Sequence, residues 1–465
     1  MMNVQSPSIA TLQEFEVRNP YDNSLVGKVH ETSTEEIQTI VANATKAADA
    51  FRFSTPHERR ALLNRIADLM GQDAENLAQT VSQEMGKTIT EARNEIRRAQ
   101  NTLRLSGDAA TFLDGDVLHT GIVAGGPDRQ AVITYEPVGV VAAITPFNYP
   151  VNLLCHKLGP AIAAGNAVIA KPSPKAPLAA QMLIDLCDEA GAPKDLIQIV
   201  HGGAEAAIAL AKAPIDLLSF TGGPGAGLAL KNASGLVRCL MELGGNDPLF
   251  VLPDGDLEAA AKTAVTQRYE IAGQSCAAVK KLYVHEAIEA DFTDRLLALV
   301  ANVGMGDPSD PATIMGPVID AASAIEIEAR IEAAVAGGAH VLTGGRRQHT
   351  HFDPVVMSGM DPRSKLMREE TFGPVISIRS FTDFSGAIGE VNAAGFGLQA
   401  GVYTNDHAAI KLASRQLKVG GVMINEGPDF RVEHVPFGGV RKSGLGREGV
   451  RIALREMSET KVVID

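Results

Sequence analysis

The chain has 465 residues, room for about three units of ~150 residues, and 45% of them are hydrophobic and 21% charged, as in soluble globular proteins. The formal net charge of −13 argues against nonspecific binding to nucleic acid or to an acidic membrane surface. No run reaches the ~18 uninterrupted apolar residues of a membrane helix, and the polar residues 1–6 lack the core of a signal peptide. We therefore expect a cytoplasmic protein with neither a nucleic-acid nor a membrane partner.

The spacing of the cysteines indicates free thiols. The chain has 4 of them, Cys155, Cys187, Cys239 and Cys276, and they form no CxxC pair and no cluster with histidine. This spacing predicts neither a zinc site nor a disulfide framework, and no metal is expected. A reducing compartment fits this pattern and would protect a reactive thiol.

The N-terminal part is expected to be rich in helices. Residues 33–103 begin with Ser33 and Glu36, a pair that resembles a capping box. Amphipathic runs follow near 35–54, 56–70 and 73–105. Each of these runs predicts one helix.

Further along, strands and helices alternate. Residues 128–142 read as strands, and the apolar runs 167–170 and 197–200 flank a predicted helix at 176–190. A second series begins near 245, with predicted helices at 255–270 and 286–302. This rhythm is typical of α/β proteins with parallel sheets, and without a long linker the domains are expected to interleave.

Cys276 is the strongest candidate for a catalytic group. It lies in the small, polar segment 273–278, and the Gly-rich turn 242–248 carries Glu242. A free thiol has a pKa of about 8.5, and attack on a carbonyl needs the thiolate, so a base must take the proton. Glu242 could do this directly or through one water, and could later activate a second water to hydrolyse a thioester.

Two other segments are suited to holding charge. The apolar run 138–142 leads into a Pro-fixed loop at 143–150, where the amide of Asn148 could donate to an oxyanion. The Gly-rich segment 220–227 follows an apolar stretch and precedes a helix, so its backbone amides could face a pyrophosphate.

Together these segments resemble the aldehyde dehydrogenase superfamily over nearly the whole chain and in the family's order. The matching segments are Asn19-Pro20, which resembles the family's first strand, and 145–148, 171–173, 220–222 with Gly227, 242–245, 273–276, 370–374 and 436–439. The resemblance implies a Rossmann-like cofactor domain (1–117 and 137–242) and an α/β catalytic domain (243–443). It also implies a small β oligomerisation element (118–136 and 444–465), and hence a homodimer or homotetramer.

The resemblance implies oxidation of an aldehyde with NAD or NADP. Cys276 would attack the carbonyl, the Asn148 amide and the Cys276 N–H would hold the oxyanion, and Glu242 would activate the hydrolytic water. Lys157, behind the pocket, joins these as a catalytic residue. A CoA-acylating dehydrogenase and a non-enzymatic protein of the same fold remain as alternatives.

In the family, Lys171 holds the adenosine ribose, and Glu370 and Phe372 hold the nicotinamide ribose and ring. NAD-preferring members often have a Glu where this chain has Pro174, so NADP should be tolerated. The cofactor residues implied by the resemblance are Thr145, Pro146, Phe147, Lys171, Ser173, Pro174, Phe220, Thr221, Gly222, Gly223, Gly227, Leu243, Glu370 and Phe372.

The implied substrate pocket is polar and cationic, because His156 and Arg431 stand where members acting on apolar aldehydes tend to carry aromatic residues. The full set is Tyr149, Leu153, His156, Ser275, Asp429, Arg431, Phe437 and, on the last N-terminal helix, Arg104. Relatives that bind phosphorylated aldehydes have an Arg at the position of Ser275. Carboxylated semialdehydes, lactaldehyde-like molecules and sulfonated aldehydes therefore remain open.

Overall fold

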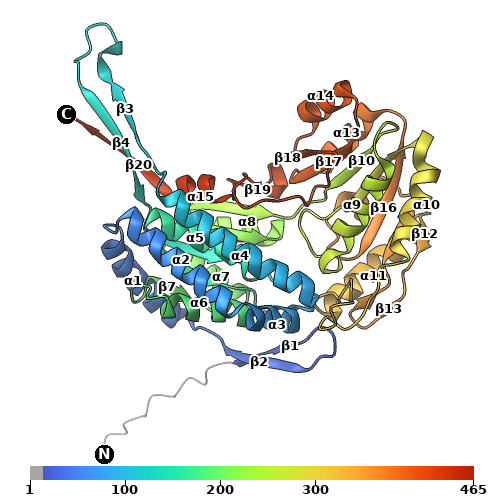
Figure 1. The fold of residues 1–465 in the computed structure, drawn as a ribbon, viewed down its shortest axis with the longest axis horizontal. Helices are drawn as coiled ribbons and strands as arrows, with labels where there is room; N and C mark the ends of the chain where they lie inside the picture. The colour runs from blue at the N-terminus through green and yellow to red at the C-terminus, as the bar shows by residue number, and fades with distance from the viewer. Residues whose placement is uncertain (1–13) are drawn as a thin grey trace, which may run out of the picture.

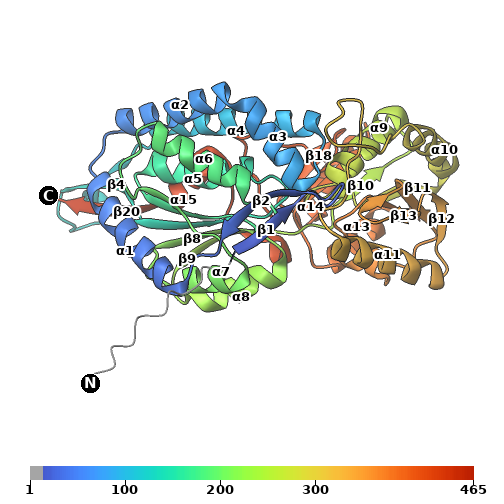
Figure 2. The same cartoon turned by 90° about the horizontal axis from the view of Figure 1, so that it is seen from below.

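The computed structural model describes residues 14–465, which form two α/β units and a projecting sheet (Figure 1). Each unit has its own hydrophobic core. Viewed from below, the units lie side by side, and the hairpin of β1 (Glu14–Arg18) and β2 (Leu25–His30) lies below the first unit toward their junction (Figure 2). Within the described residues, no helix is both long and apolar enough to cross a membrane. The predicted α/β class is confirmed.

The first unit contains a six-stranded sheet in the order β19-β9-β8-β5-β6-β7. Its strands are β5 (Val140–Ile144), β6 (Ala167–Lys171), β7 (Ile197–Ile199), β8 (Leu217–Gly222), β9 (Arg238–Leu243) and β19 (Gly444–Leu445). Its helices are α1 (Thr34–Phe51), α2 (Pro56–Gln72), α3 (Ala74–Met85), α4 (Ile89–Ala110), α5 (Asn152–Ala164), α6 (Leu178–Glu189), α7 (Ala204–Lys212), α8 (Pro224–Ser234) and α15 (Val450–Glu456). Strands β5 and β6 are buried at every residue, which is why they read as continuous apolar runs.

The strand order places a crevice at one edge of this sheet. Strand β5 pairs in parallel with β6 on one side and with β8 on the other. After β5 the chain continues to β6 and β7 on one side, and it then returns to β8 on the other side of β5. The loops at the carboxyl ends of β5 and β8 therefore diverge, as in other open α/β sheets that bind ligands there. The predicted oxyanion residue Asn148 follows β5, the predicted phosphate loop spans the end of β8, and the predicted base Glu242 is the last-but-one residue of β9.

The amphipathic pattern predicted a single helix over 73–105, but the structure contains two helices there. Helix α3 is capped at its C-terminus by Gly86, whose φ of 76° is left-handed, and α4 is capped at its N-terminus by Thr88, whose side chain forms a capping box with Glu91. The capping box of Ser33 and Glu36 is confirmed at the start of α1. Asn19 lies in the turn after β1 rather than in a strand, and its N–H donates to the Ser24 carbonyl at 2.9 Å.

The second unit contains a seven-stranded sheet in the order β12-β15-β16-β11-β10-β17-β18, in which only the β12–β15 pairing is antiparallel. Its strands are β10 (Pro248–Val251), β11 (Lys281–His285), β12 (His340–Thr343), β15 (Val355–Ser358), β16 (Val375–Phe381), β17 (Gln399–Tyr403) and β18 (Gly421–Ile424). Its helices are α9 (Leu257–Tyr269), α10 (Glu289–Val300), α11 (Ala321–Ala336), α12 (Lys365–Arg368), α13 (Phe384–Ala393) and α14 (His407–Gln416). Short 3₁₀ turns lie at Thr120–Ile122, Glu270–Gly273, Glu286–Ile288 and Arg441–Ser443, and a small hairpin joins β13 (Arg347–Gln348) to β14 (His351–Phe352).

A three-stranded antiparallel sheet projects from the first unit (Figure 1). It consists of β3 (Asp116–His119), β4 (Gln130–Pro137) and β20 (Ser458–Ile464). The predicted hairpin near 118–136 and the C-terminal strand thus lie together. The start of the predicted C-terminal segment packs elsewhere, because β19 pairs with β9 in the six-stranded sheet and α15 contacts α5.

Candidate active site

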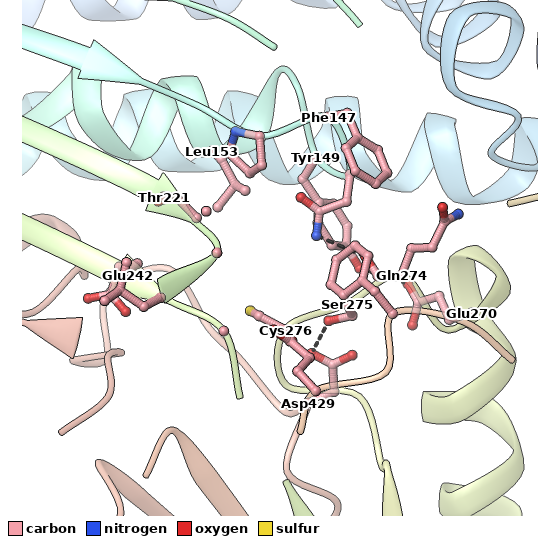
Figure 3. Close-up of a pocket in the computed structure, with 18 of the residues that line it drawn as sticks. Phe147, Tyr149, Leu153, Thr221, Glu242, Glu270, Gln274, Ser275, Cys276 and Asp429 are labelled. Atoms are coloured by element: carbon pink, nitrogen blue, oxygen red, sulfur yellow. Dashed lines mark hydrogen bonds between the residues drawn. The ribbon is translucent and has the colours of Figure 1, made fainter. Parts of the chain in front are cut away.

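A cavity of about 490 Å³ lies between the two units, at the carboxyl ends of β5, β8 and β9 (Figure 3). It brings together Cys276, Glu242 and Asn148, which are far apart in the sequence. The other predicted residues that line it are Pro146, Phe147, Tyr149, Leu153, Thr221, Gly222, Gly223, Leu243, Ser275, Glu370, Phe372, Asp429, Arg431 and Phe437. The predicted residues outside its lining are Thr145, His156, Lys157, Lys171, Ser173, Pro174, Phe220, Gly227 and Arg104.

The loop that carries Cys276 is held from both units. Two residues before Gly273 have left-handed backbone, Ile271 at φ 51° and Ala272 at φ 52°, a conformation that costs energy for a β-branched residue. The Ile271 N–H donates to a carboxylate oxygen of Glu91 on α4 at 2.8 Å. Neither this anchor nor the strain was predicted from the sequence, because both depend on tertiary contacts.

A buried lysine fixes the other side of the same loop. Lys280 Nζ donates to the carbonyl oxygens of Ser275 at 2.8 Å and Cys276 at 2.5 Å, and lies 3.5 Å from a Glu370 oxygen. Lysine rarely lies fully buried unless it is paired, and here carbonyl and carboxylate oxygens surround its charge. Lys280 therefore links the nucleophile loop to the segment carrying Glu370.

The Cys276 thiol is half-buried and lies among carboxyl groups. Burial and the nearby Asp429 carboxyl raise the pKa of Cys276, while the Lys280 charge lowers it to a smaller extent. The thiol form is therefore the resting form. Thiolate must be generated by removal of a proton at the time of reaction.

Asn148 is oriented for donation. One N–H of its side-chain amide donates to the Gln274 carbonyl at 2.9 Å, two residues before Cys276. A side-chain amide has two N–H donors, so the second stays available for a developing oxyanion. The hydrogen bond to Gln274 also sets the angle of the amide plane.

Glu242, the last-but-one residue of β9, belongs to a buried charge network. Glu448 accepts from Lys157 Nζ at 2.9 Å and from Arg431 at 2.8 Å, whereas one Glu242 oxygen is buried without a partner among the described residues. Burial and the Glu448 charge raise the pKa of Glu242 well above its ordinary value. Burial opposes ionisation of Glu448 too, but the Lys157 and Arg431 charges outweigh it and lower its pKa. Glu242 is therefore the carboxyl that exchanges a proton.

The family comparison agrees with this constellation. The model of the aldehyde dehydrogenase family matches residues 8–463. The chain belongs to the aldehyde dehydrogenase family.

Its relatives include enzymes with small, polar substrates. It is 38% identical to a sulfoacetaldehyde dehydrogenase of Neptuniibacter caesariensis, over 97% of this chain and 99% of that one. It is also 38% identical to aspartate-semialdehyde dehydrogenase 1 of Pseudomonas canavaninivorans, over 99% of each chain. A solved structure of an NADP-dependent glyceraldehyde-3-phosphate dehydrogenase from Bacillus halodurans, complexed with NADP, has a TM-score of 0.95 and 33% identity and covers 97% of this chain and 95% of that one.

The residues that hold the nicotinamide half in the family lie beside Cys276. Glu370 accepts from the Gly245 N–H at 3.3 Å, and a Cβ on Gly244 would force its other oxygen to move. Phe372 packs edge-to-face on Phe147 with ring centres 5.9 Å apart. Glu370 and the phenyl rings thus form one wall of the cavity.

The residues predicted to bind the pyrophosphate and the adenosine ribose lie at the ends of β8 and β6. Gly223 precedes α8 as its N-cap without a side-chain cap, so the first amides of α8 are free of a side-chain acceptor, as an anion site requires. Lys171 ends β6, and burial lowers its pKa to about 8. Lys175, which follows Pro174, pairs with Asp320 at 2.5 Å.

Arg98 and Arg431 both line the cavity, and only Arg431 was predicted. Arg431 stacks on Phe437 with its guanidinium carbon 4.2 Å from the ring centre. Arg98 on α4 also lines the cavity and donates to Glu433 at 2.8 Å. The prediction of Arg104 was wrong, because its side chain is 46% exposed and pairs with Asp68 at 2.8 Å. Six positions along a helix rotate a side chain by roughly 240°, away from the face of Arg98.

The second correction concerns His156. It is buried behind the cavity and neither ring nitrogen has a hydrogen-bond partner within the described residues. Burial and the Arg431 charge lower its pKa well below the ordinary value. His156 is therefore neutral and adds no positive charge to the pocket.

The cavity lining also includes the acids Asp429, which was predicted, and Glu270, which was not. Ser275 Oγ donates to Asp429 at 3.0 Å, as Figure 3 shows, and the other Asp429 oxygen is buried with no partner in the described part of the chain. Burial and the Asp429 charge raise the pKa of Glu270 to about 7, and burial also raises that of Asp429. The pocket thus offers both cations and hydrogen-bond acceptors.

Proposed function

We propose that this protein oxidises a small anionic or hydroxylated aldehyde to the carboxylic acid with NAD or NADP. The observation that carries this proposal is the convergence of Cys276, Asn148 and Glu242 on one cavity whose wall holds Arg98 and Arg431. The family assignment supports the reaction class. The relatives that act on sulfoacetaldehyde and aspartate semialdehyde support an anionic substrate.

The first half-reaction joins substrate to protein. Cys276 Sγ bonds to the carbonyl carbon while its proton passes to Glu242, directly or through one water. The oxygen gains negative charge and accepts from the Asn148 amide and the Cys276 N–H. Glu370 and Phe372 on the cavity wall would hold the nicotinamide half of a bound cofactor, which would supply the hydride acceptor. Loss of the hydride would leave the carbon as a thioester of Cys276.

The second half-reaction releases the acid. Glu242 first releases to solvent the proton that it took from Cys276. As the carboxylate, it then takes a proton from a water that attacks the thioester carbon, and the bond to Cys276 Sγ breaks. The sulfur leaves as a thiolate and regains a proton, so the thiol is restored. Lys157 and Arg431 keep Glu448 ionised beside Glu242, so the exchangeable proton belongs to Glu242.

A CoA-acylating reaction is the second candidate. It needs no base for water, so the presence of Glu242 on the cavity favours hydrolysis. Product analysis decides between them: free acid without added CoA supports our proposal, and a product that forms only with CoA contradicts it. Failure of any aldehyde to reduce either cofactor would favour a non-enzymatic protein.

Substrate charge is tested with aldehydes of equal length, one carboxylated or sulfonated and one neutral. Loss of a buried guanidinium contact to an anion costs about 2–5 kcal/mol, so Arg98→Ala and Arg431→Ala should lower kcat/KM for the anionic aldehyde far more than for the neutral one. Arg104→Ala is the matched control and should change neither. Equal losses for both aldehydes would show that the arginines are structural.

The projecting sheet supports a homodimer or homotetramer, and the free cysteines support a cytoplasmic location. Apolar side chains exposed on this sheet and its connecting turn are Val117, Leu118, Ile122, Val123, Val132, Val462, Val463 and Ile464. An exposed apolar patch of this kind is typical of a protein interface. Light scattering after gel filtration should give two or four times the chain mass, and a monomer would contradict this part of the proposal.

A further inference from the structure

A carboxylate from the N-terminal hairpin lies at the loop after β7, next to the end of β6, where Lys171 stands. Thr32, just after β2, is tied to the loop after β7: its N–H donates to the His201 carbonyl at 3.0 Å, and its hydroxyl accepts from the His201 N–H at 2.9 Å. These bonds place the preceding residue, Glu31, against Gly202 and Gly203. The segment was not singled out in the sequence, because it lies 140 positions before Lys171 (171 − 31).

The contacts of Glu31 are close. Its Oε1 accepts from the Gly203 N–H at 3.4 Å, and a Cβ on Gly202 would lie 2.9 Å from the same oxygen. The φ of Gly202 is 141°, so the chain needs glycine there both for its backbone and for the approach of Glu31. The negative charge of Glu31 also acts on Lys171, opposing the effect of burial on its pKa.

Among the described residues, no other cation near this site compensates for Glu31. The Lys175 charge is paired with Asp320, and burial together with the Lys171 charge lowers the pKa of His201 to about 4, so His201 is neutral. His201 Nε2 lies 2.8 Å from Gln181 Oε1. Glu31 and Lys171 are therefore charges of opposite sign at the neighbouring ends of β6 and β7.

We propose that Glu31 is a specificity-determining residue of the cofactor site, where its carboxylate accepts from the ribose hydroxyls of NAD and repels the 2′-phosphate of NADP. The inference rests on the proposed function for the placement of the adenosine ribose at Lys171. Pro174 stands on the loop after β6, where NAD-preferring relatives often carry a carboxylate. Glu31 supplies a carboxylate from a different element, the segment after β2. The tolerance of NADP expected from Pro174 alone is thereby reduced.

The test measures binding without aldehyde or turnover. Isothermal titration of the full chain with NAD, NADP and their adenosine halves, 5′-AMP and 2′,5′-ADP, gives the ratio of dissociation constants for phosphorylated and unphosphorylated ligands. Glu31→Gln keeps an oxygen that can accept from the Gly203 N–H, so the loop contact survives while the charge is lost. We expect the ratio to move toward the phosphorylated ligands by about fivefold or more, the factor that ~1 kcal/mol of lost repulsion gives.

Two further variants sharpen the result. Glu35→Gln removes an exposed carboxylate four positions along and should leave the ratio unchanged. Pro174→Glu added to Glu31→Gln should return the preference to NAD. A ratio within twofold of wild type in Glu31→Gln, or equal weakening of all four ligands, would overturn the inference. Because no aldehyde is present, these outcomes are independent of whether the chain oxidises one.

Discussion

Two buried charge networks flank Cys276, and they differ in how their cations are shared. On the side of β9, Lys157 and Arg431 both bind Glu448, and Glu242 is left without a direct ion pair to any described residue. On the side of β11, Lys280 lies 3.5 Å from Glu370, and its charge also acts on the buried carboxyls of Asp247 and Asp429.

The difference separates two tasks. On the β9 side, the Lys157 and Arg431 charges outweigh burial and lower the pKa of Glu448, whereas burial and the Glu448 charge raise the pKa of Glu242, so Glu242 takes up a proton more readily than Glu448. On the β11 side, burial and the Asp429 charge raise the pKa of Cys276, so its proton stays on sulfur until a base removes it. The two networks therefore predict a protein that makes thiolate only when a reaction partner is present.

The largest effect is expected at the sulfur. Cys276→Ala removes the atom that carries the acyl group in the proposed mechanism, so aldehyde-dependent reduction of NAD or NADP should fall to background. The absorbance of the reduced nicotinamide measures it. Normal steady turnover by this variant would remove Cys276 from the mechanism.

The next largest effect is expected at the oxyanion. Asn148→Ala deletes a preoriented donor and should cost roughly 100- to 1000-fold in kcat. The Gln274 carbonyl also loses its partner, so unfolding by denaturant should be measured alongside. A loss of only a few-fold in kcat would exclude Asn148 from this role.

Glu242→Gln tests the β9 network directly. It should slow steady turnover by about 100-fold, the lower end for loss of a general base, and leave a first burst of reduced cofactor if the thiol can still lose its proton. The raised pKa of Glu242 means that carboxylate forms as pH increases through that pKa and is lost below it. Deacylation of wild type should thus rise with pH across that range, whereas Glu242→Gln should show no such rise in rapid-mixing experiments.

Lys280→Met tests the β11 network, with the smallest expected effect. Loss of the cation should raise the pKa of Cys276 further, so the thiolate fraction at a fixed pH falls, by about tenfold if the pKa rises by about 1, and alkylation by iodoacetamide slows in proportion. Lys281→Met is the matched control, since Lys281 is also buried but donates to neither carbonyl of the Cys276 loop. Identical alkylation profiles for all three proteins would show that Lys280 does not act on the thiol.

The sequence predicted those site residues whose role follows from a short motif. Cys276, Asn148 and Glu242 lie in short motifs whose loops follow strands, and the structure brings all three to one cavity. The alternation of apolar runs and helical segments is also a local pattern, and it predicted the two mainly parallel sheets.

Prediction from the sequence failed where a residue's role depends on distant partners. Arg98 and Arg104 have the same charge on the same helix, and only the docking of Glu433 against one face tells them apart. The charge of His156 is determined by burial, which a motif does not reveal. Lys280 lies directly beside the Cys276 motif, yet its role depends on two carbonyls that turn back toward it.

The ion pair of Arg98 and Glu433 has a consequence for biosynthesis. Its partners are 335 positions apart, so the arginine emerges from the ribosome long before the carboxylate that holds it. The helical N-terminal part can form early, but loop-closure entropy delays contacts of such separation until the C-terminal part has been made. A nascent chain that has folded β5 to β9 but lacks Glu433 would therefore hold the proposed cofactor crevice without a finished anion pocket, and selectivity for an anionic aldehyde would come last.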